Sequence, residues 1–446
     1  MNVSPSRNEA MEGRISRRSL ILMVSLAIAA AATVTVVALT PADGQSVADE
    51  DREGWMSYVD YYVGTGEVVD EIQTNLLNDL AGAENRIDAA IAEIDDGPIV
   101  QALVDAADRG VAVRVVADEL FADHDGFAPL VDHDDIDVVF GDGELAYLPE
   151  PNLSPILEYC DSEATEHDDH ITCAQARGGL PENNPRVIVR PAHYNVMSHT
   201  FFIIDTVDVW NISAPLNDEQ PLWVAFRVLS EEIANSYERE FRQMHGGVFS
   251  TTLSVYNGPL KSVTHQNPLR WTNRGNLRIR FNPQERLTKN IIDETYRARA
   301  SVYVMTENLT NTNLIDALLY KKEAGFDVRV LVGQGQATTL EDRIAPLEPR
   351  VATEDMGRLP TMVIFDSRRD RNGNRQARQV QVLSHELMRA QPFEVLRASP
   401  SDRVRFYPSD TFADGVLWEI LESGSQRNPE IDAFLDAFNE QWSQAQ

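Results

Sequence analysis

Two stretches of this chain match one another at a constant separation in the sequence. The first runs over residues 85–118 and the second over 300–333. Identical residues lie 215 positions apart in the two stretches: Ala102 and Ala317, Leu103 and Leu318, Gly110 and Gly325, and Arg114 and Arg329. A fixed offset through a strand–helix–strand pattern is typical of a duplicated module, so we expect two copies of one supersecondary unit.

Each copy has the pattern of a βαβ unit. In the first copy, an apolar strand over 86–94 precedes a helix that begins at Pro98 and ends before Gly110, and a β-branched strand over 111–116 follows. Because a helix joins the two strands, we expect them to be parallel. A further helix is predicted over 68–80, before the first copy. For the second copy the sequence predicts a helix over 285–299, a strand over 301–305, a helix over 314–324 and a strand over 328–332.

The charge balance excludes several classes of partner. The 446 residues include 70 acidic and 39 basic side chains, which gives a net charge of −31. No long run of lysine or arginine is present, so we expect neither nucleic acid nor an anionic membrane surface as a partner. The hydrophobic fraction of 43% is that of a globular protein, and we interpret the charge as a solubilising surface.

The first 42 residues have the composition of an export segment. Arg17 and Arg18 precede an apolar run over 20–39, and small residues over 40–42 would suit cleavage. Paired arginines before an apolar run resemble a bacterial twin-arginine export signal. The run is also long enough to span a bilayer, so an uncleaved membrane anchor is the alternative. We therefore expect a protein that is periplasmic, secreted or anchored to the cell membrane by this segment alone.

Two cysteines lie close together in an acidic, polar stretch. Cys160 and Cys173 are the only cysteines of the chain, and in an exported protein such a pair predicts a disulfide. The alternative is a zinc site of Cys160, His167, His170 and Cys173, although their spacing matches no common zinc module. We predict the disulfide, no metal and no other cofactor.

Downstream of each copy lies a strand that leads to an aspartate. The segment MSHTFFIID over 197–205 ends in Asp205, and Ser213 follows eight residues later. In the second half the strand ends in Asp366, and Ser384 follows a polar hairpin over 367–379. These segments resemble the signature of the phospholipase D superfamily, His-x-Lys-x4-Asp followed by Gly-Ser-x-Asn.

The resemblance implies an α/β fold of two phospholipase D-like αβ repeats, packed with pseudo-twofold symmetry, each a mixed sheet flanked by helices. In that family the active site lies between the repeats. One histidine forms a phosphohistidine, the other protonates the leaving group, and two lysines hold the non-bridging oxygens. The predicted organisation is an export signal or anchor over 1–42, a linker and N-terminal extension over 43–66, a first repeat over 67–260 with a Cys-containing insertion at about 140–190, a connector over 261–276 and a second repeat over 277–446.

The basic groups of the family are missing from both motifs. Counting back from Asp205, Ser198 is at the histidine position and Thr200 at the lysine position. Counting back from Asp366, the corresponding residues are Leu359 and Thr361, and Pro215 and Glu386 stand at the two asparagine positions. Of the signature, only Asp205, Ser213, Asp366 and Ser384 remain.

Other histidines and aspartates lie near these motifs. His199 and His385 could replace the lost histidines, but each is one residue out of register, and a one-residue shift on a strand turns the side chain to the opposite face. A second group could bind metal, but we interpret it as a solvated acidic loop. Its members are His124, Asp132, His133, Asp134 and Asp135.

The missing groups decide the predicted function. A phosphodiesterase needs a nucleophile, an acid and cations around the phosphate, and the motifs supply none of them. We therefore expect an exported protein of the cell envelope that has lost phosphodiesterase catalysis and has a binding or structural role. Its ligand, in a cleft between the repeats, is not identified by the sequence. The alternative is an active phospholipase or phosphodiesterase with relocated catalytic histidines.

Overall fold

The computed structural model divides the chain into two units, 1–53 and 54–446, and all the residues it describes belong to the second. The described residues are 57–95, 97–118, 121–141, 172–174, 186–189, 197–213, 216, 222–249, 253–254, 258–259, 261, 270–272, 275–282, 284–334, 341–369, 375–376, 378–384, 387, 393–396, 404–406, 415–421 and 429–446. None of the helices in this part of the chain is long and apolar enough to cross a membrane. The apolar run over 20–39 lies outside it.

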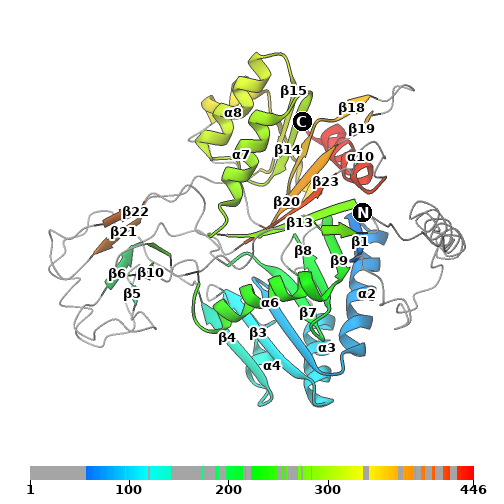
Figure 1. Cartoon of the computed structure of the whole chain (residues 1–446), viewed down its shortest axis with the longest axis vertical. Coiled ribbons are helices and arrows are strands. Elements are labelled where there is room, and N and C mark those ends of the chain that lie inside the picture. The colour runs from blue at the N-terminus through cyan, green and yellow to red at the C-terminus, as the bar shows by residue number, and fades with distance from the viewer. Residues whose placement is uncertain are drawn as a thin grey trace, which may run out of the picture. The chain divides into compact units, whose positions relative to one another are not determined.

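The first repeat is built on a seven-stranded mixed sheet (Figure 1). Its strands are β1 (Tyr58–Gly64), β2 (Arg86–Ile91), β3 (Ala112–Asp118), β4 (Ile136–Gly141), β7 (Thr200–Ile204), β8 (Asp208–Ile212) and β9 (Trp223–Leu229). Their order is β1-β9-β8-β7-β2-β3-β4. Strands β2 and β3 are parallel, as the first copy predicts, whereas β7 is antiparallel to β2. Strand β2 ends at Ile91, three residues before the predicted end, because Ile94 makes only an isolated bridge with Leu216.

Helices cover both faces of this sheet. On one face, α2 (Glu67–Gly82) and α3 (Gly97–Asp108) pack against apolar side chains of β2 and β3, and we call this group the first outer cluster. On the other face lies α6 (Glu231–His245), whose N-terminus is capped by the Ser230 side chain. A short helix, α4 (Ala128–Val131), precedes β4.

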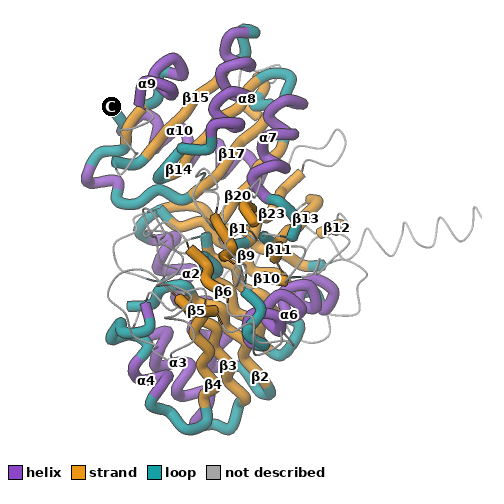
Figure 2. The backbone as a smooth tube through the Cα atoms, turned by 90° about the vertical axis from the view of Figure 1, so that its left-hand side faces the viewer, coloured by secondary structure: helices purple, strands orange, loops and turns teal. Residues whose placement is uncertain are grey.

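The second repeat is built on an eight-stranded mixed sheet, and Figure 2 shows its strands beside helices α7 and α8. Its strands are β12 (Arg270–Thr272), β13 (Gly275–Phe281), β14 (Ser301–Thr306), β15 (Asp327–Val332), β16 (Arg350–Val351), β17 (Thr361–Phe365), β20 (Gln379–Leu383) and β23 (Val416–Leu421). Their order is β12-β13-β23-β20-β17-β14-β15-β16. The parallel pair β14–β15 and the antiparallel pair β14–β17 repeat the arrangement of β2, β3 and β7.

Helices again cover both faces. Helices α7 (Leu287–Arg297) and α8 (Thr312–Glu323) form the second outer cluster with β14 and β15, and α10 (Pro429–Gln444) packs on the opposite face. A short helix, α9 (Glu341–Ile344), continues into a 3-10 turn over Ala345–Leu347, and another 3-10 turn spans Glu354–Met356. The predicted α/β class, with two repeats that are each a mixed sheet flanked by helices, is therefore confirmed. The pseudo-twofold packing of the repeats stays a prediction.

The matched glycines end equivalent helices. Gly110 follows α3 with a backbone φ of 89°, and Gly325 follows α8 with a φ of 84°. Only glycine adopts this left-handed conformation without strain, which explains why both copies retain it. The matched arginines lie at the same register but have different partners, because Arg114 pairs with Asp88 whereas Arg329 lies 4.8 Å over the Tyr303 ring.

Three smaller sheets complete the described structure. The predicted polar hairpin is present as β18 (Arg368–Arg369) and β19 (Arg375–Gln376). Strands β10 (Leu253–Ser254) and β11 (Gly258–Pro259) form a second short pair. In the third sheet, two strands of the Cys-containing insertion pair with each other, and one of them also pairs with a strand of the second half. Its order is β22 (Val404–Phe406), β21 (Phe393–Leu396), β6 (Arg186–Val189) and β5 (Thr172–Ala174).

Both sheets contribute to one hydrophobic group, which we call the central cluster. It contains Phe226 from β9 and Trp418 from β23, whose ring centroids are 4.9 Å apart. Side chains of α6 and α10 also belong to it. Apolar burial is the dominant stabilising term in folding, so this shared cluster stabilises both repeats.

Candidate functional site

The two motif strands occupy equivalent places in their sheets. Thr200, the first residue of β7, pairs with Ile91 at the carboxyl end of β2, and β17 runs beside β14 in the same antiparallel sense. The carboxyl ends of the parallel strands and the start of each motif strand therefore lie at one edge of each sheet. Ligands of α/β proteins commonly bind at that edge, so the side chains there define the candidate site.

Thr200 and Thr361, at the two lysine positions, are both buried. The Thr361 hydroxyl lies 3.0 Å from the hydroxyl of Thr306, the last residue of β14. Leu359, at a histidine position, belongs to the central cluster, and its backbone N–H donates to Glu307 Oε2 at 3.1 Å. Ser198, at the other histidine position, is half-buried. None of the four side chains is basic, so none can attack phosphorus as an imidazole or neutralise its oxygens.

The two motif aspartates hold backbone rather than facing a ligand. The carboxylate of Asp205 accepts hydrogen bonds from the backbone N–H groups of Glu84, Asn85 and Arg86, at 2.9, 2.7 and 3.0 Å. Burial alone would raise the pKa of Asp205, but these three bonds outweigh it and lower the pKa below its ordinary value. Asp205 thus fixes the chain that enters β2.

Asp366 has the same role in the second repeat. Its carboxylate accepts from the backbone N–H groups of Arg299 and Ala300, at 2.5 and 2.8 Å, just before β14. Both aspartates also have a positive backbone φ, 49° for Asp205 and 56° for Asp366. The aspartate that follows the motif strand therefore has a structural role in both repeats.

The two motif serines differ in their contacts. The Ser384 hydroxyl accepts a hydrogen bond from the backbone N–H of Val416 at 2.9 Å, which ties β20 to β23. The Ser213 hydroxyl is buried and has no hydrogen-bond partner in the described part of the chain, although its backbone N–H donates to the Val224 carbonyl at 2.8 Å. Neither serine lies next to a described histidine that could activate it.

His199 lies inside the protein. Phe201 and Ile203 of β7 belong to the central cluster, whereas Phe202 and Ile204 belong to the first outer cluster. By this alternation His199 is on the central face, where its ring contacts Phe201 at a centroid distance of 5.2 Å. The side chain is completely buried, and neither ring nitrogen has a hydrogen-bond partner among the residues that the structure describes.

A buried ion pair lies beside this imidazole. Glu240 of α6 pairs with Lys261, and both side chains are fully buried. The second oxygen of Glu240 accepts from Gln284 Nε2 at 2.7 Å, and its first oxygen is 3.7 Å from His199 Nε2. Burial lowers the pKa of His199 against the opposing effect of Glu240, and the Lys261 charge lowers it further. The imidazole is therefore held neutral in a polar group that joins α6, the predicted connector and the start of the second repeat.

Several sequence candidates lie outside the described residues. These are His385, Pro215, Glu386, Cys160, His167 and His170. Cys173 is in β5, but its side chain is not described, so the predicted disulfide and the zinc alternative both stay predictions.

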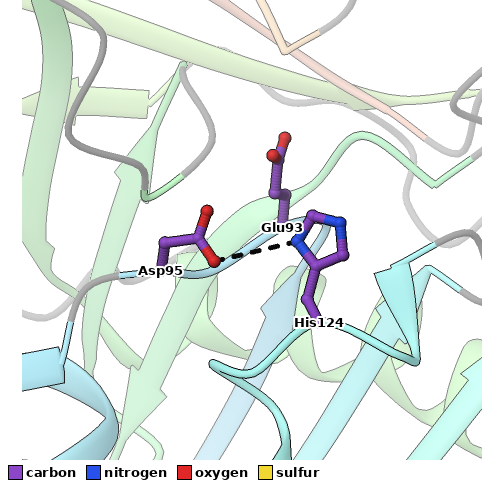
Figure 3. A group of neighbouring side chains, drawn as sticks. All are labelled: Glu93, Asp95 and His124. Carbon is purple, nitrogen blue, oxygen red and sulfur yellow. Dashed lines mark ion pairs between the residues drawn. The ribbon is translucent and has the colours of Figure 1, made fainter.

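A group that sequence reasoning missed lies at the edge of the first sheet. Glu93 and Asp95 follow β2, and His124 follows β3; one donor atom from each lies within 4.8 Å of the others. Figure 3 shows the three side chains facing a common space, with His124 Nδ1 3.7 Å from Asp95 Oδ1. The signal was available, because parallel neighbours end at the same edge of a sheet.

The acidic loop that the sequence grouped with His124 does not converge. His133 instead faces α3, where its Nε2 is 3.4 Å from Asp108 Oδ1, and its Nδ1 accepts from the backbone N–H of Asp135. Asp132 and Asp134 are exposed. Of the predicted group, only His124 lies beside Glu93 and Asp95.

Comparison with known proteins adds structures but no close relative. The sequence matches no protein-family model and no curated protein. Among solved structures it is similar to Nuc from Salmonella typhimurium, a phospholipase D family member, with 14% identity, 38% of this chain and 95% of that chain covered, and a TM-score of 0.28. Phosphatidylserine synthase of Haemophilus influenzae Rd KW20 gives 11% identity, 86% and 88% coverage and a TM-score of 0.47. Polyphosphate kinase from Porphyromonas gingivalis gives 13% identity, 91% and 54% coverage and a TM-score of 0.44.

Proposed function

We propose that this chain is an exported phospholipase D-like protein that has lost phosphodiesterase catalysis and acts as a binding or structural protein of the cell envelope. The observation that carries the proposal is the chemistry of the four motif positions. They hold a half-buried serine, two buried threonines and a leucine in the hydrophobic core.

Phosphoryl transfer depends almost entirely on positioning and on charge. A nucleophile and an acid must flank the phosphorus, and cations must offset the charge on its oxygens. Removing a single preorganised donor from such a site typically costs about 100- to 1000-fold in rate. Here both lysines and both histidines are replaced, so residual turnover is expected to fall to the spontaneous rate.

The burial of His199 speaks against the alternative of relocated catalytic histidines. A catalytic imidazole must come within hydrogen-bond reach of its substrate. The His199 ring is enclosed by Phe201, Phe281 and the Glu240–Lys261 pair, and no part of its side chain is exposed. The envelope location is supported by the paired arginines and the apolar run of the N-terminal segment.

A turnover assay tests the proposal. We expect purified full-length protein to hydrolyse neither bis(4-nitrophenyl) phosphate nor phospholipid vesicles faster than buffer does. Turnover that is lost in His199→Ala or His385→Ala, but retained in His133→Ala as a matched surface control, would establish the active alternative. Thermal-shift screening complements this assay, because the four motif positions carry no basic group, which favours a neutral polar or cationic ligand over a phosphate ester. Stabilisation by phosphate esters alone would contradict that expectation.

A further inference from the structure

The carboxylates of the first sheet differ in how their charge is neutralised. Asp88 of β2 accepts two hydrogen bonds of 2.7 Å from Arg114, and Asp208 of β8 pairs with Arg227 at 2.6 Å. Within the part of the chain that the structure describes, no arginine or lysine pairs with Glu93 or Asp95. The imidazole of His124 lies beside both carboxylates (Figure 3). Two carboxylates brought together without a basic partner repel each other unless a cation lies between them.

The backbone holds these side chains in place. Glu93 and Asp95 are both hydrogen-bonded through their backbone to Leu216. The Leu216 N–H donates to the Glu93 carbonyl at 3.1 Å, and the Asp95 N–H donates to the Leu216 carbonyl at 2.8 Å. The loop that carries His124 packs directly against this segment. A Cβ at Gly126 would lie 1.9 Å from Ile94 O, so only glycine allows this close approach.

The spacing of the donor atoms suits a metal ion. Two ligands that each lie about 2.1 Å from one ion are themselves about 3 to 4 Å apart. The distance of 3.7 Å between His124 Nδ1 and Asp95 Oδ1 is within that range, and all three donors lie within 4.8 Å. The Asp95 and His124 side chains are 48% and 38% exposed, so small rotations can close the set and an ion can enter from solvent.

We propose that Glu93, Asp95 and His124 form a binding site for a divalent transition-metal ion of the Zn²⁺ class. One imidazole with two carboxylates favours zinc and its neighbours over Ca²⁺ and Mg²⁺, which take oxygen ligands almost exclusively. Three protein ligands leave at least one coordination position for water or an external ligand. The site does not depend on the loss of phosphodiesterase catalysis, because none of its residues belongs to the signature motifs.

Calorimetric titration of the chelator-treated full-length protein with Zn²⁺ tests the site. We expect one equivalent to bind with an affinity that falls at least about tenfold in His124→Ala and in Glu93→Gln, as loss of a ligand requires. His133→Ala is the matched control, since His133 lies on the same loop but faces Asp108. Any zinc ligands elsewhere, including the Cys160–Cys173 segment, are common to all variants and cancel in the comparison.

Titration with Co²⁺ gives a second readout. Its visible absorption bands report the ligand set, and we expect them to change in His124→Ala but not in His133→Ala. The site is ruled out if Zn²⁺ affinity in His124→Ala stays within twofold of the parent, or if His133→Ala weakens it equally. Binding of Ca²⁺ as tight as that of Zn²⁺ would also overturn the assignment, because it would mean that the imidazole is not a ligand.

Discussion

Replacing Lys261 by methionine is expected to destabilise the protein strongly. The Glu240 and Lys261 side chains are both fully buried, and they pair at the start of the predicted connector. Among the described residues, Lys261→Met would leave the Glu240 carboxylate in the interior beside the Gln284 amide and the His199 imidazole, neither of which supplies a full positive charge. Removing one partner of a buried ion pair typically costs about 3–5 kcal/mol, because the remaining charge stays unpaired and desolvated.

A matched double variant separates the destabilisation caused by one unpaired buried charge from the net contribution of the ion pair to the free energy of unfolding. In Glu240→Gln/Lys261→Met both charges are removed and the side-chain volumes are nearly kept. Such replacements are often neutral or slightly stabilising, so we expect most of the lost stability to return. Urea unfolding of all variants, with a common m-value, gives the free energies of unfolding. If Lys261→Met costs less than about 1 kcal/mol, Glu240 and Lys261 are solvated and the buried junction described here is wrong.

Three further predictions follow from the repeats. Asp205→Ala should lower the free energy of unfolding by about 2–3 kcal/mol, because the Asp205 carboxylate accepts from three backbone N–H groups. Asp366→Ala should lower it by less, because Asp366 accepts from two. If urea unfolding shows that neither variant is less stable than the parent, the capping role is refuted. The pKa of His199 in the folded protein lies below its ordinary value of 6.5, so the unfolded chain binds more protons below that pH and the free energy of unfolding falls as pH drops through 6.5. His199→Gln should remove this part of the pH dependence. An unchanged dependence of stability on pH in this variant would contradict the prediction. Gly110→Ala and Gly325→Ala should each cost about 1 kcal/mol or more, because both glycines have positive φ; a stabilising effect on thermal unfolding at either position would count against equivalent helix ends.

Local patterns predicted the repeated unit well. The constant offset placed Gly110 and Gly325 after equivalent helices, and β-branched runs marked the parallel strands that follow them. Side-chain alternation also predicted that His199 lies on the opposite face of its strand from Thr200. These features depend on residues within one strand, helix or turn, where the chain's own periodicity decides the structure.

Contacts between distant segments could not be predicted in the same way. Lys261 looked like part of a polar connector, yet its side chain is buried against Glu240, because a charge can enter the interior when its partner is supplied by another element. Strand β6 pairs with β21, more than 200 residues later, and no local pattern signals that pairing. Strand β1 belongs to the first main sheet although the sequence assigned it to the N-terminal extension, and strand β12 belongs to the second although the sequence assigned it to the connector.

The candidate metal group has the same explanation. Glu93 and Asp95 lie in one short loop segment and His124 in another, and the sequence grouped His124 with its neighbours in the acidic loop. Only the order of strands β2 and β3 in the sheet brings them to one edge. The motif positions, by contrast, were assigned from the sequence alone, and the structure adds that Thr200, Leu359 and Thr361 are buried.

The proposed loss of phosphodiesterase catalysis is tested most directly by intact-mass spectrometry, which detects any phosphohistidine intermediate. Full-length protein would be incubated with a large excess of bis(4-nitrophenyl) phosphate and quenched in base to preserve any phosphohistidine. The mass of the intact protein would then be measured, and fragmentation would locate any adduct. With no imidazole available at the motif positions, we expect the mass to stay unchanged at every time point. A stoichiometric aryl-phosphoryl adduct on His199 or His385 would contradict this and show that a relocated histidine attacks phosphorus.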